Sequence, residues 1–403
     1  MPEETVAARD AVEQRVLDLI DPAEIRDLTL DLIRCDSQNP PADPDAPVEA
    51  AAVRVLAEAC ERRGLEVRTD DAAPGRPNLT ARLAGTDAPG LLVLAHTDTV
   101  PVGDGWTVPP LGGTVADGRV VGRGASDMKG GIAAAVAAMS ALRRAGARTP
   151  PVTLAAVADE EETGIGARAF TAVADGAAYA GAIVPEPTEM QTIIACRGDC
   201  YVEVEVRGRA AHAGDPDTGA SAIYGAARLI DAVRALHEEN RAHPHPLLGP
   251  RTWNVGIVHG GFGTAVVPDE CRVSIDRRLL PGESGARAVA EIDDVLAALR
   301  LDGLGLTSRA WLGMEMPGFE TPADHGLVRT AHAAAHDAGA PVREVGGWTA
   351  ACDGGYVARD LGVPAIVLGP GSVVHQAHRP DESVAVDELA VAARTYALAA
   401  LRL

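Results

Sequence analysis

LLVLAHTDTV, residues 91–100, is the stretch around which the chain is organised. Its first five residues, Leu91 to Ala95, are apolar without alternation, and Pro101 stops the run. An unbroken apolar run of this length is typical of a strand covered on both faces, as in the parallel sheet of an α/β protein. His96 and Asp98 follow at its carboxyl end. Because alternate strand residues share a face, both point to one side of the edge where such sheets bind ligands.

The spacing of His96 and Asp98 suits a metal-bound imidazole. A neutral histidine gives one ring nitrogen to the metal, while a nearby carboxylate accepts the other ring N–H and fixes the tautomer. A single histidine at a strand end is more often an ordinary hydrogen-bonded residue than a ligand. The metal interpretation therefore needs support from other segments.

Composition excludes several classes of function. Asp and Glu number 57 against 36 Lys and Arg, a net charge of −21 that repels nucleic acids and anionic membranes. Residues 1–16 are charged throughout, and no apolar run approaches the roughly twenty residues that span a bilayer. The six scattered cysteines show neither zinc-finger spacing nor a disulfide framework. We expect a cytoplasmic protein with reduced thiols and no nucleic-acid or membrane partner.

The chain is long enough for two domains, since 403 residues exceed the usual size of a single core. Strands alternate with helices in the first half, which favours a doubly wound α/β domain with a central, mostly parallel sheet. YVEVEVRG, residues 201–208, instead alternates strictly, as a half-exposed antiparallel strand does, and opens a β-α-β-β-α-β order of the ferredoxin-like α+β type. We predict a main domain over 1–196 and 313–403, with an inserted α+β domain over 197–312.

Element boundaries follow from periodicity, glycine and proline. Helices are predicted where apolar residues recur at helical spacing: residues 6–34 with a break at Asp21-Pro22, 48–63, 130–145, 218–237, 284–299 and 324–338. Further strands of the main domain are predicted at 65–69, 78–84, 152–158, 180–184 and 362–369. Residues 37–47 and 101–130 are predicted as loops, and the second is long enough to indicate a functional one.

Four apolar runs of the main domain end in residues that can bind a metal or act as a base. These are His96 and Asp98, Glu160 and Glu161, Glu186, and His375 or His378, and Asp127 joins them from the long loop. The carboxyl ends of parallel strands meet at one crevice, so these side chains are expected to converge. Two zinc ions about 3.5 to 4 Å apart need one bridging carboxylate and further imidazole and carboxylate ligands. The pattern therefore predicts a dinuclear metal site.

Five segments resemble one enzyme family in their order and spacing. They are LAHTDTVP, GRGASDMKGG, ADEEETGIGA, VPEPTE and AHRPDE. The chain resembles the co-catalytic dizinc amidohydrolases and peptidases, which include acetylornithine deacetylase, succinyl-diaminopimelate desuccinylase, aminoacylase and glutamate carboxypeptidase. The resemblance covers nearly the whole chain, and it implies that the inserted α+β domain is a lid and dimerisation domain in a homodimer.

The resemblance also implies a ligand set. His96 and Glu186 are expected to hold one zinc ion and Glu161 and His378 the other, with Asp127 bridging both. Cobalt or manganese would be accepted by the same imidazole and carboxylate ligands. In the family a cis peptide commonly follows the bridging aspartate.

The adjacent glutamates are expected to divide the chemistry. On an extended segment Glu160 and Glu161 face opposite ways, so one can bind metal while the other faces the reacting water. The resemblance makes Glu160 the general base that takes a proton from the water and passes it to the leaving amine, and it makes Asp98 the residue that orients His96. Two alternatives stay open: the acidic run as a solvated surface, and His375 in place of the histidine three residues later.

Two residues of the inserted domain resemble substrate-binding positions. His212, in RAAHAGDPDTG, resembles the histidine that reaches across a dimer interface to stabilise the oxyanion. Arg278, in IDRRLLPGE, resembles an arginine that binds a substrate carboxylate through two hydrogen bonds. A surface-loop histidine and an ion-paired arginine are the alternatives. The chain departs from the family at Ala265, where most members carry an asparagine, so we expect a shifted substrate preference.

The backbone of Gly369 and Gly371 is expected to line the pocket, because glycine lets a ligand approach closely. The leading hypothesis is a metal-dependent hydrolase that removes the acyl group from an N-acyl amino acid or related amine. A dizinc carboxypeptidase or dipeptidase acting on short peptides is the alternative within the class. A non-catalytic member that binds a small molecule is the alternative from another class, and the intact Glu160 and ligand positions argue against it.

Overall fold

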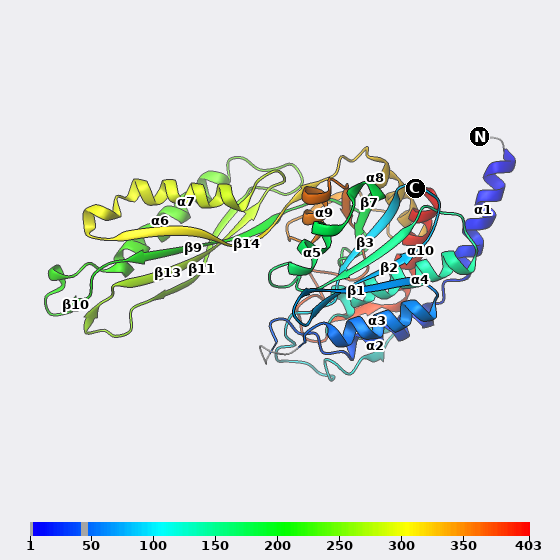
Figure 1. Ribbon diagram of the computed structural model, residues 1–403, viewed down its shortest axis with the longest axis horizontal. Coiled ribbons are helices and arrows are strands. Elements are labelled where there is room, and N and C mark those ends of the chain that lie inside the picture. The colour runs from blue at the N-terminus through cyan, green and yellow to red at the C-terminus, as the bar shows by residue number, and fades with distance from the viewer. Residues whose placement is uncertain (1–2, 42–46) are drawn as a thin grey trace. The chain divides into compact units, whose positions relative to one another are not determined.

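The computed structural model describes residues 3–41 and 47–403 (Figure 1). The loop predicted at 37–47 lies partly outside these residues, because 42–46 are not described. Among the described residues, no helix is long and apolar enough to cross a membrane. All six cysteines lie in the described residues, and none of them forms a disulfide bond.

The chain divides into two compact units, one inserted into the other. The first unit comprises Met1–Ile194, Glu320–Gly346 and Asp353–Leu403, and the second comprises Ala195–Phe319 and Gly347–Cys352. The insertion was expected over 197–312. Its last strand is longer than the apolar pattern indicated, and the short segment Gly347–Cys352 joins it because Arg197 N–H donates to the carbonyl of Trp348 (3.1 Å).

The first unit is built on a sheet whose central strands are parallel. The strand order is β1-β2-β6-β3-β7-β17-β8-β15, with β16 beside β8. The four parallel strands are β6 (Val152–Val157), β3 (Gly90–His96), β7 (Tyr179–Val184) and β17 (Ala365–Val367). The others are β1 (Glu66–Ala73), β2 (Arg76–Leu83), β8 (Ile193–Cys196), β15 (Phe319–Glu320) and β16 (Gly346–Trp348). The expectation of an α/β domain with a mostly parallel central sheet is confirmed.

One edge of this sheet is antiparallel, which the apolar pattern did not indicate. β1 and β2 pair from Glu66↔Arg82 to Ala73↔Arg76, so only two residues join them, and Gly75 takes a positive φ of 73°. A two-residue connection can form only a hairpin, since parallel neighbours need a long crossover. The hairpin leaves the parallel strands in the middle of the sheet.

Helices cover both faces of the parallel strands. The chain passes from β3 through α4 (Gly130–Arg144) to β6 on one side, then from β6 through α5 (Ile165–Val173) to β7 on the other side of β3. Right-handed crossovers in opposite directions place α4 and α5 on opposite faces. The remaining helices are α1 (Glu3–Asp18), α2 (Pro22–Ile33), α3 (Ala50–Arg62), α8 (Gly326–Ala338), α9 (Gly354–Leu361) and α10 (Val386–Arg402). The reversal of winding direction opens a crevice at the strand ends.

The long segment 101–130 is more ordered than a plain loop. It contains β4 (Thr114–Ala116) and β5 (Arg119–Val121), and β5 pairs with β18 (Ser383–Ala385) from the other end of the chain. A kinked segment, Ala125–Lys129, then leads into α4; within it Asp127 and Met128 have non-helical backbone angles. This small sheet pairs β5 with β18, which lie far apart in the sequence, and no local pattern predicts their pairing.

The second unit has the predicted β-α-β-β-α-β order. Its elements are β9 (Gly198–Arg207), α6 (Ala222–Asn240), β11 (Thr252–Gly260), β13 (Glu270–Leu279), α7 (Gly285–Leu299) and β14 (Thr307–Met316), with the short strands β10 (Ala211–His212) and β12 (Val266–Val267) beside them. The sheet order β11-β13-β9-β14, antiparallel throughout, is the ferredoxin-like arrangement. Val202, Val204 and Val206 alternate into its core, as YVEVEVRG predicts.

Leu94→Ala tests the central position of β3. Leu94 is fully buried, so its truncation should lower the free energy of unfolding by about 2 to 5 kcal/mol. Val173→Ala is the control, because Val173 is 81% exposed and its loss should change stability by no more than about 0.5 kcal/mol. Urea unfolding measures both, and equal midpoints for the two variants would contradict the buried position of this strand.

Candidate metal centre

The predicted ligands meet at the carboxyl ends of the parallel strands. His96 is the last residue of β3, and Glu186 lies two residues after β7. Glu161 lies in the turn that follows β6, and Asp127 lies in the kinked segment Ala125–Lys129 before α4. His378 comes from the segment between β17 and β18, where it takes a positive φ of 62°.

Asp127 lies between two imidazole rings. Its Oδ1 is 3.2 Å from Nε2 of His96, and its Oδ2 is 3.3 Å from Nε2 of His378. Glu186 Oε1 is 3.6 Å from the ring of His96, and Glu161 Oε2 is 3.3 Å from the ring of His378. The five donors therefore form two groups that share one carboxylate.

The donor set fits metal binding. Two overlapping triads, His96 with Glu160 and Glu186 and His96 with Asp127 and Glu161, each bring one ligand atom per residue within 4.8 Å of the others. Imidazole and carboxylate donors at this density suit zinc, cobalt or manganese. Neither His375 nor His378 belongs to these triads, but His378 contacts Asp127 and Glu161 at 3.3 Å each. The backbone N–H of His375 donates to Ser372 Oγ (3.2 Å).

The electrostatics of the centre favour bound positive charge. Hydrogen bonds to Asp127 and Glu161 raise the pKa of His378 to about 11. Burial lowers the pKa of His96, but hydrogen bonds to Asp127 and Asp98 outweigh burial and raise it well above its usual value. Burial likewise raises the pKa of Asp127, and the two histidines outweigh it and lower that pKa. Metal binding here displaces protons, since a ligating imidazole must be neutral.

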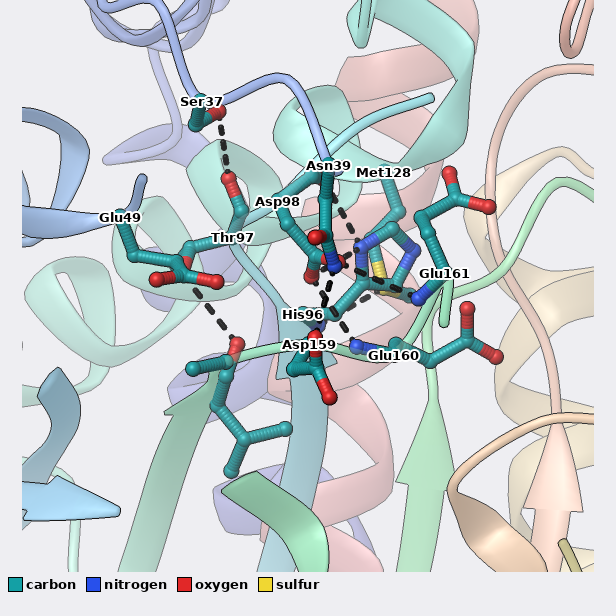
Figure 2. Close-up of polar contacts among 12 residues, drawn as sticks. Ser37, Asn39, Glu49, His96, Thr97, Asp98, Met128, Asp159, Glu160 and Glu161 are labelled. Carbon is teal, nitrogen blue, oxygen red and sulfur yellow. Dashed lines mark hydrogen bonds and ion pairs between the residues drawn. The ribbon is translucent and has the colours of Figure 1, made fainter. Parts of the chain in front are cut away.

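Asp98 positions both the ring of His96 and the glutamate pair. The ring nitrogen Nδ1 lies 3.0 Å from the backbone carbonyl oxygen of Asp98 and 3.5 Å from its carboxylate. That carboxylate accepts the backbone N–H groups of Glu160 and Glu161, at 3.2 Å each, and the side-chain amide of Asn39 at 2.9 Å (Figure 2). The family resemblance implied that Asp98 orients the ring of His96. It did not indicate that Asp98 also accepts hydrogen bonds from the backbone of Glu160 and Glu161.

A second buried network supports the same turn, and no pattern in the sequence indicated it. The amide of Asn39 also donates to Asp159 Oδ1 (2.9 Å), and Arg76 donates to Asp159 (3.0 Å) while it pairs with Glu49 at 2.6 and 2.5 Å. Asp159 has a positive φ of 68°, so the chain turns sharply directly before Glu160. These partners lie 83 to 120 residues from Asp159 in sequence, and no local pattern connects them.

Asp353, at the start of α9, is a further buried acid near the centre that the sequence did not indicate. Neither of its carboxylate oxygens has a hydrogen-bond partner among the described residues. Burial raises its pKa to about 8; the charge on His96 lowers the pKa, and those on Asp98 and Asp159 raise it. Burial therefore favours the neutral form of this side chain.

The predicted substrate-binding residues of the second unit lie on its strands. His212 is exposed on β10, and its Nδ1 accepts the backbone N–H of Gly214 (3.0 Å). Arg278, on β13, is 32% exposed and pairs with Asp276 (3.1 Å) and Asp199 (3.3 Å). Both roles stay predictions.

Gly369 and Gly371 lie in the first unit, where packing leaves no room for a side chain. A Cβ at Gly369 would lie 2.2 Å from the carbonyl oxygen of Pro185, and one at Gly371 would overlap Ser126 Oγ. Gly371 also has a positive φ of 89°. Tight packing therefore explains both glycines, and their part in substrate binding stays a prediction.

The Asp127–Met128 peptide is cis, as the resemblance implies.

Residues 92–402 match the sequence family described as peptidase family M20/M25/M40. The chain belongs to this family. It is 32% identical over 346 residues to an acetylornithine deacetylase of Aliivibrio fischeri, covering 83% of this chain and 87% of that protein. As an M20/M25/M40 member the chain is a metal-dependent hydrolase that acts on amide bonds.

Solved structures of other M20 proteins share the fold. A metallo-carboxypeptidase of Sulfolobus solfataricus aligns with a TM-score of 0.78 at 19% identity, covering 94% of this chain and 99% of that one. A peptidase of Bacillus subtilis described as dinuclear metal binding aligns with a TM-score of 0.68 at 14% identity, covering 97% and 98%.

Asp353→Asn should flatten the pH dependence of stability in the metal-free protein. The native carboxyl has a pKa near 8 against 3.8 for the ordinary group, so between these values only the folded state holds the proton. The free energy of unfolding of the wild type should then fall as pH rises, by up to about 1.4 kcal/mol per pH unit, and asparagine removes that contribution. Urea unfolding at pH 5.5, 6.5 and 7.5 measures the slopes, with the exposed Asp324→Asn as control. Parallel slopes for wild type and Asp353→Asn would contradict the assignment.

Proposed function

We propose that the chain is a dizinc deacylase that hydrolyses the amide bond of an N-acyl amino acid or a related amine. The observation that carries the proposal is the position of Asp127, whose two oxygens face the rings of His96 and His378. A carboxylate flanked in this way can bridge two metal ions. The similarity to acetylornithine deacetylases supports an acylated amino acid as the substrate class.

In this proposal the two ions have separate ligands beside the shared one. His96 and Glu186 hold the first, Glu161 and His378 hold the second, and Asp127 contacts both. Two bound zinc ions would supply an acidified water and polarise the substrate carbonyl. Cobalt or manganese can replace zinc in such a donor set. The Bacillus subtilis relative, described as dinuclear metal binding, supports the number of ions.

Glu160 is the proposed general base. A carboxylate oxygen of Glu160 lies within 4.8 Å of ligand atoms of His96 and Glu186, and Asp98 holds its backbone N–H. Burial raises the pKa of Glu160, against the lowering effect of the charge on His96. A carboxylate with a raised pKa can take a proton from water and release it to the leaving amine.

The second unit is proposed to bind and polarise the substrate. Because Nδ1 of His212 accepts a hydrogen bond, a neutral ring carries its proton on Nε2, where it can donate to a developing oxyanion. Arg278 is proposed to bind the substrate carboxylate, with Asp199 and Asp276 holding its guanidinium. Ala265 cannot supply the amide of other members, so the preferred substrate differs from theirs. The backbone of Gly369 and Gly371 lines the pocket in this proposal.

We also propose a homodimer formed through the second unit. β11 is an edge strand that exposes Ile257 (51%) and Val258 (46%). Beside it, Tyr224 of α6 and Phe262 lie on a groove of about 1060 Å³ and are 75% and 83% exposed. An unpaired apolar edge of this kind suits pairing with a second copy of the same surface. A dimer would allow His212 to act on the partner's site.

We propose a cytoplasmic location, which the six cysteines support because none of them is in a disulfide bond.

A dizinc carboxypeptidase or dipeptidase is the second candidate. The fold shared with the Sulfolobus metallo-carboxypeptidase favours it, and Arg278 would then bind the C-terminal carboxylate of a short peptide. A non-catalytic binding protein would not need a base beside the metal ligands, so the position of Glu160 argues against that class.

Glu160→Gln tests the mechanism and the substrate class together. Wild type and variant should each bind two metal ions per chain, and the variant should lose about 10²- to 10⁴-fold in turnover of a panel of N-acetyl, N-succinyl and N-formyl amino acids. Glu162→Gln, at the exposed neighbouring glutamate, is the matched control and should keep wild-type rates. Turnover of dipeptides alone would favour the carboxypeptidase alternative. Wild type that binds no metal after zinc is supplied would overturn the hydrolase mechanism.

Ile257→Glu tests the dimer. Light scattering should give the wild type twice the 41.5 kDa mass of one chain, and a charge on the apolar edge should convert the variant to the monomer mass. Val342→Glu places the same charge on an exposed valine of the first unit and should leave the dimer intact. A monomeric wild type would remove the proposed role of His212 across the interface.

A further inference from the structure

Arg123 and Glu382 form a buried ion pair beside the proposed metal centre. Nη1 of Arg123 lies 2.7 Å from Oε2 of Glu382, and the side chains are 2% and 0% exposed. Glu382 closes the AHRPDE segment that resembles the family, but neither residue has a predicted role. A pair that is this completely desolvated must be held by further hydrogen bonds, so its other contacts matter.

The second oxygen of Glu382 binds the segment that carries the shared carboxylate. Oε1 accepts the backbone N–H of Ser126 at 2.8 Å and that of Asp127 at 3.0 Å. The backbone N–H of Gly122 also donates to the carbonyl of Glu382 (2.8 Å). Glu382 therefore accepts three backbone hydrogen bonds from residues 122–127, and these hydrogen bonds position the backbone from which Asp127 projects.

Arg123 extends the connection to two further segments. Nη1 donates to the carbonyl of Arg379 (3.3 Å), the residue after His378, and Nη2 donates to the carbonyls of Pro101 and Val102 (3.2 Å each). The ring of Trp106 covers the guanidinium at 5.3 Å. One buried cation thus joins the segment after β3, the segment before α4 and the segment of the last histidine ligand.

The two halves of the centre depend on this pair to different extents. His96 and Glu186 follow β3 and β7, which are neighbouring strands in the middle of the sheet. His378 instead lies between β17 and β18 outside any strand or helix, and its side chain is 52% exposed. The chain directly after His378 is held by Arg123, at the carbonyl of Arg379, and by Glu382. Thr107 supports the same stretch through two hydrogen bonds to the carboxylate of Asp381 (2.9 and 3.0 Å).

We propose that Arg123 and Glu382 are positioning residues that set the affinity of the metal subsite formed by Asp127, Glu161 and His378. The other subsite shares Asp127 but takes its remaining ligands, His96 and Glu186, from the ends of parallel strands, so it depends on the pair less. The inference rests on the proposed dinuclear centre. Removal of hydrogen-bonded supports behind metal ligands typically lowers affinity about 10- to 100-fold, because the ligands lose their orientation.

Titration of the metal-free protein with Co²⁺ alone measures the two affinities separately. Visible absorption of the bound cobalt follows each step, and a chelator competition with Zn²⁺ gives the dissociation constants. The wild type should take up two ions. Arg123→Met should bind the second ion about 10- to 100-fold more weakly, with a changed absorption spectrum for that step. The first ion, which also uses Asp127, should be weakened by a smaller factor.

Two further variants separate positioning from folding. Glu382→Gln can still accept the amides of Ser126 and Asp127 but loses its charge, so it should weaken the second ion by a smaller factor than Arg123→Met. It also supplies the same test if the methionine variant does not fold. Arg123→Lys keeps the charge without the planar set of donors and should restore only part of the affinity.

Arg402→Met is the matched control. Arg402, at the far end of α10, pairs with Glu13 (2.6 Å) and Asp337 (2.6 Å) in the same unit. Its removal should lower the melting temperature and leave both cobalt affinities unchanged. Equal weakening of both ions in Arg123→Met, or an unchanged second ion in every variant, would overturn the inference alone. A wild type that takes up a single ion would overturn the dinuclear proposal as well.

Discussion

The burial of several carboxylates beside one another is the constraint on which the first unit depends. Asp98, Asp127, Glu160, Glu161 and Glu186 gather where three parallel strands end, largely withdrawn from water. Such a cluster is strongly unfavourable unless positive charge and hydrogen-bond donors compensate for the lost hydration. Two histidines, backbone N–H groups and arginines from distant segments supply this compensation. Their positions determine the geometry of the site.

The parts of the site that were predicted from the sequence share one cause. A doubly wound sheet gathers the carboxyl ends of its strands, so polar residues directly after apolar runs had to converge. This reasoning identified His96, Glu161 and Glu186. The alternation along YVEVEVRG predicted a second unit with antiparallel strands. The roles of His212 and Arg278 came only from the family resemblance, and they stay predictions.

The compensating groups could not be predicted, for a physical reason. Asn39 contacts Asp98 across 59 residues of sequence, and Glu382 contacts Arg123 across 259. No periodicity or motif links residues at such distances, because their pairing depends on how the whole sheet is wound. The antiparallel hairpin at the edge of the sheet is a different case. Its Pro-Gly turn is a local signal of chain reversal, and only the antiparallel direction of its two strands was not predicted. The residues that carry buried charge can therefore be predicted from the sequence, whereas the residues that pair with them cannot.

The first and last strands of the inserted unit, β9 and β14, pair with each other, with Asp199 opposite Met316. The points at which the chain leaves and rejoins its host are therefore neighbours, and a domain with adjacent ends fits into a host loop without stretching it. Every proposed metal ligand and the proposed base lie in the host. An exchange of the insertion would therefore leave the proposed metal ligands and base in place, while it would replace His212 and Arg278, the proposed substrate-binding residues.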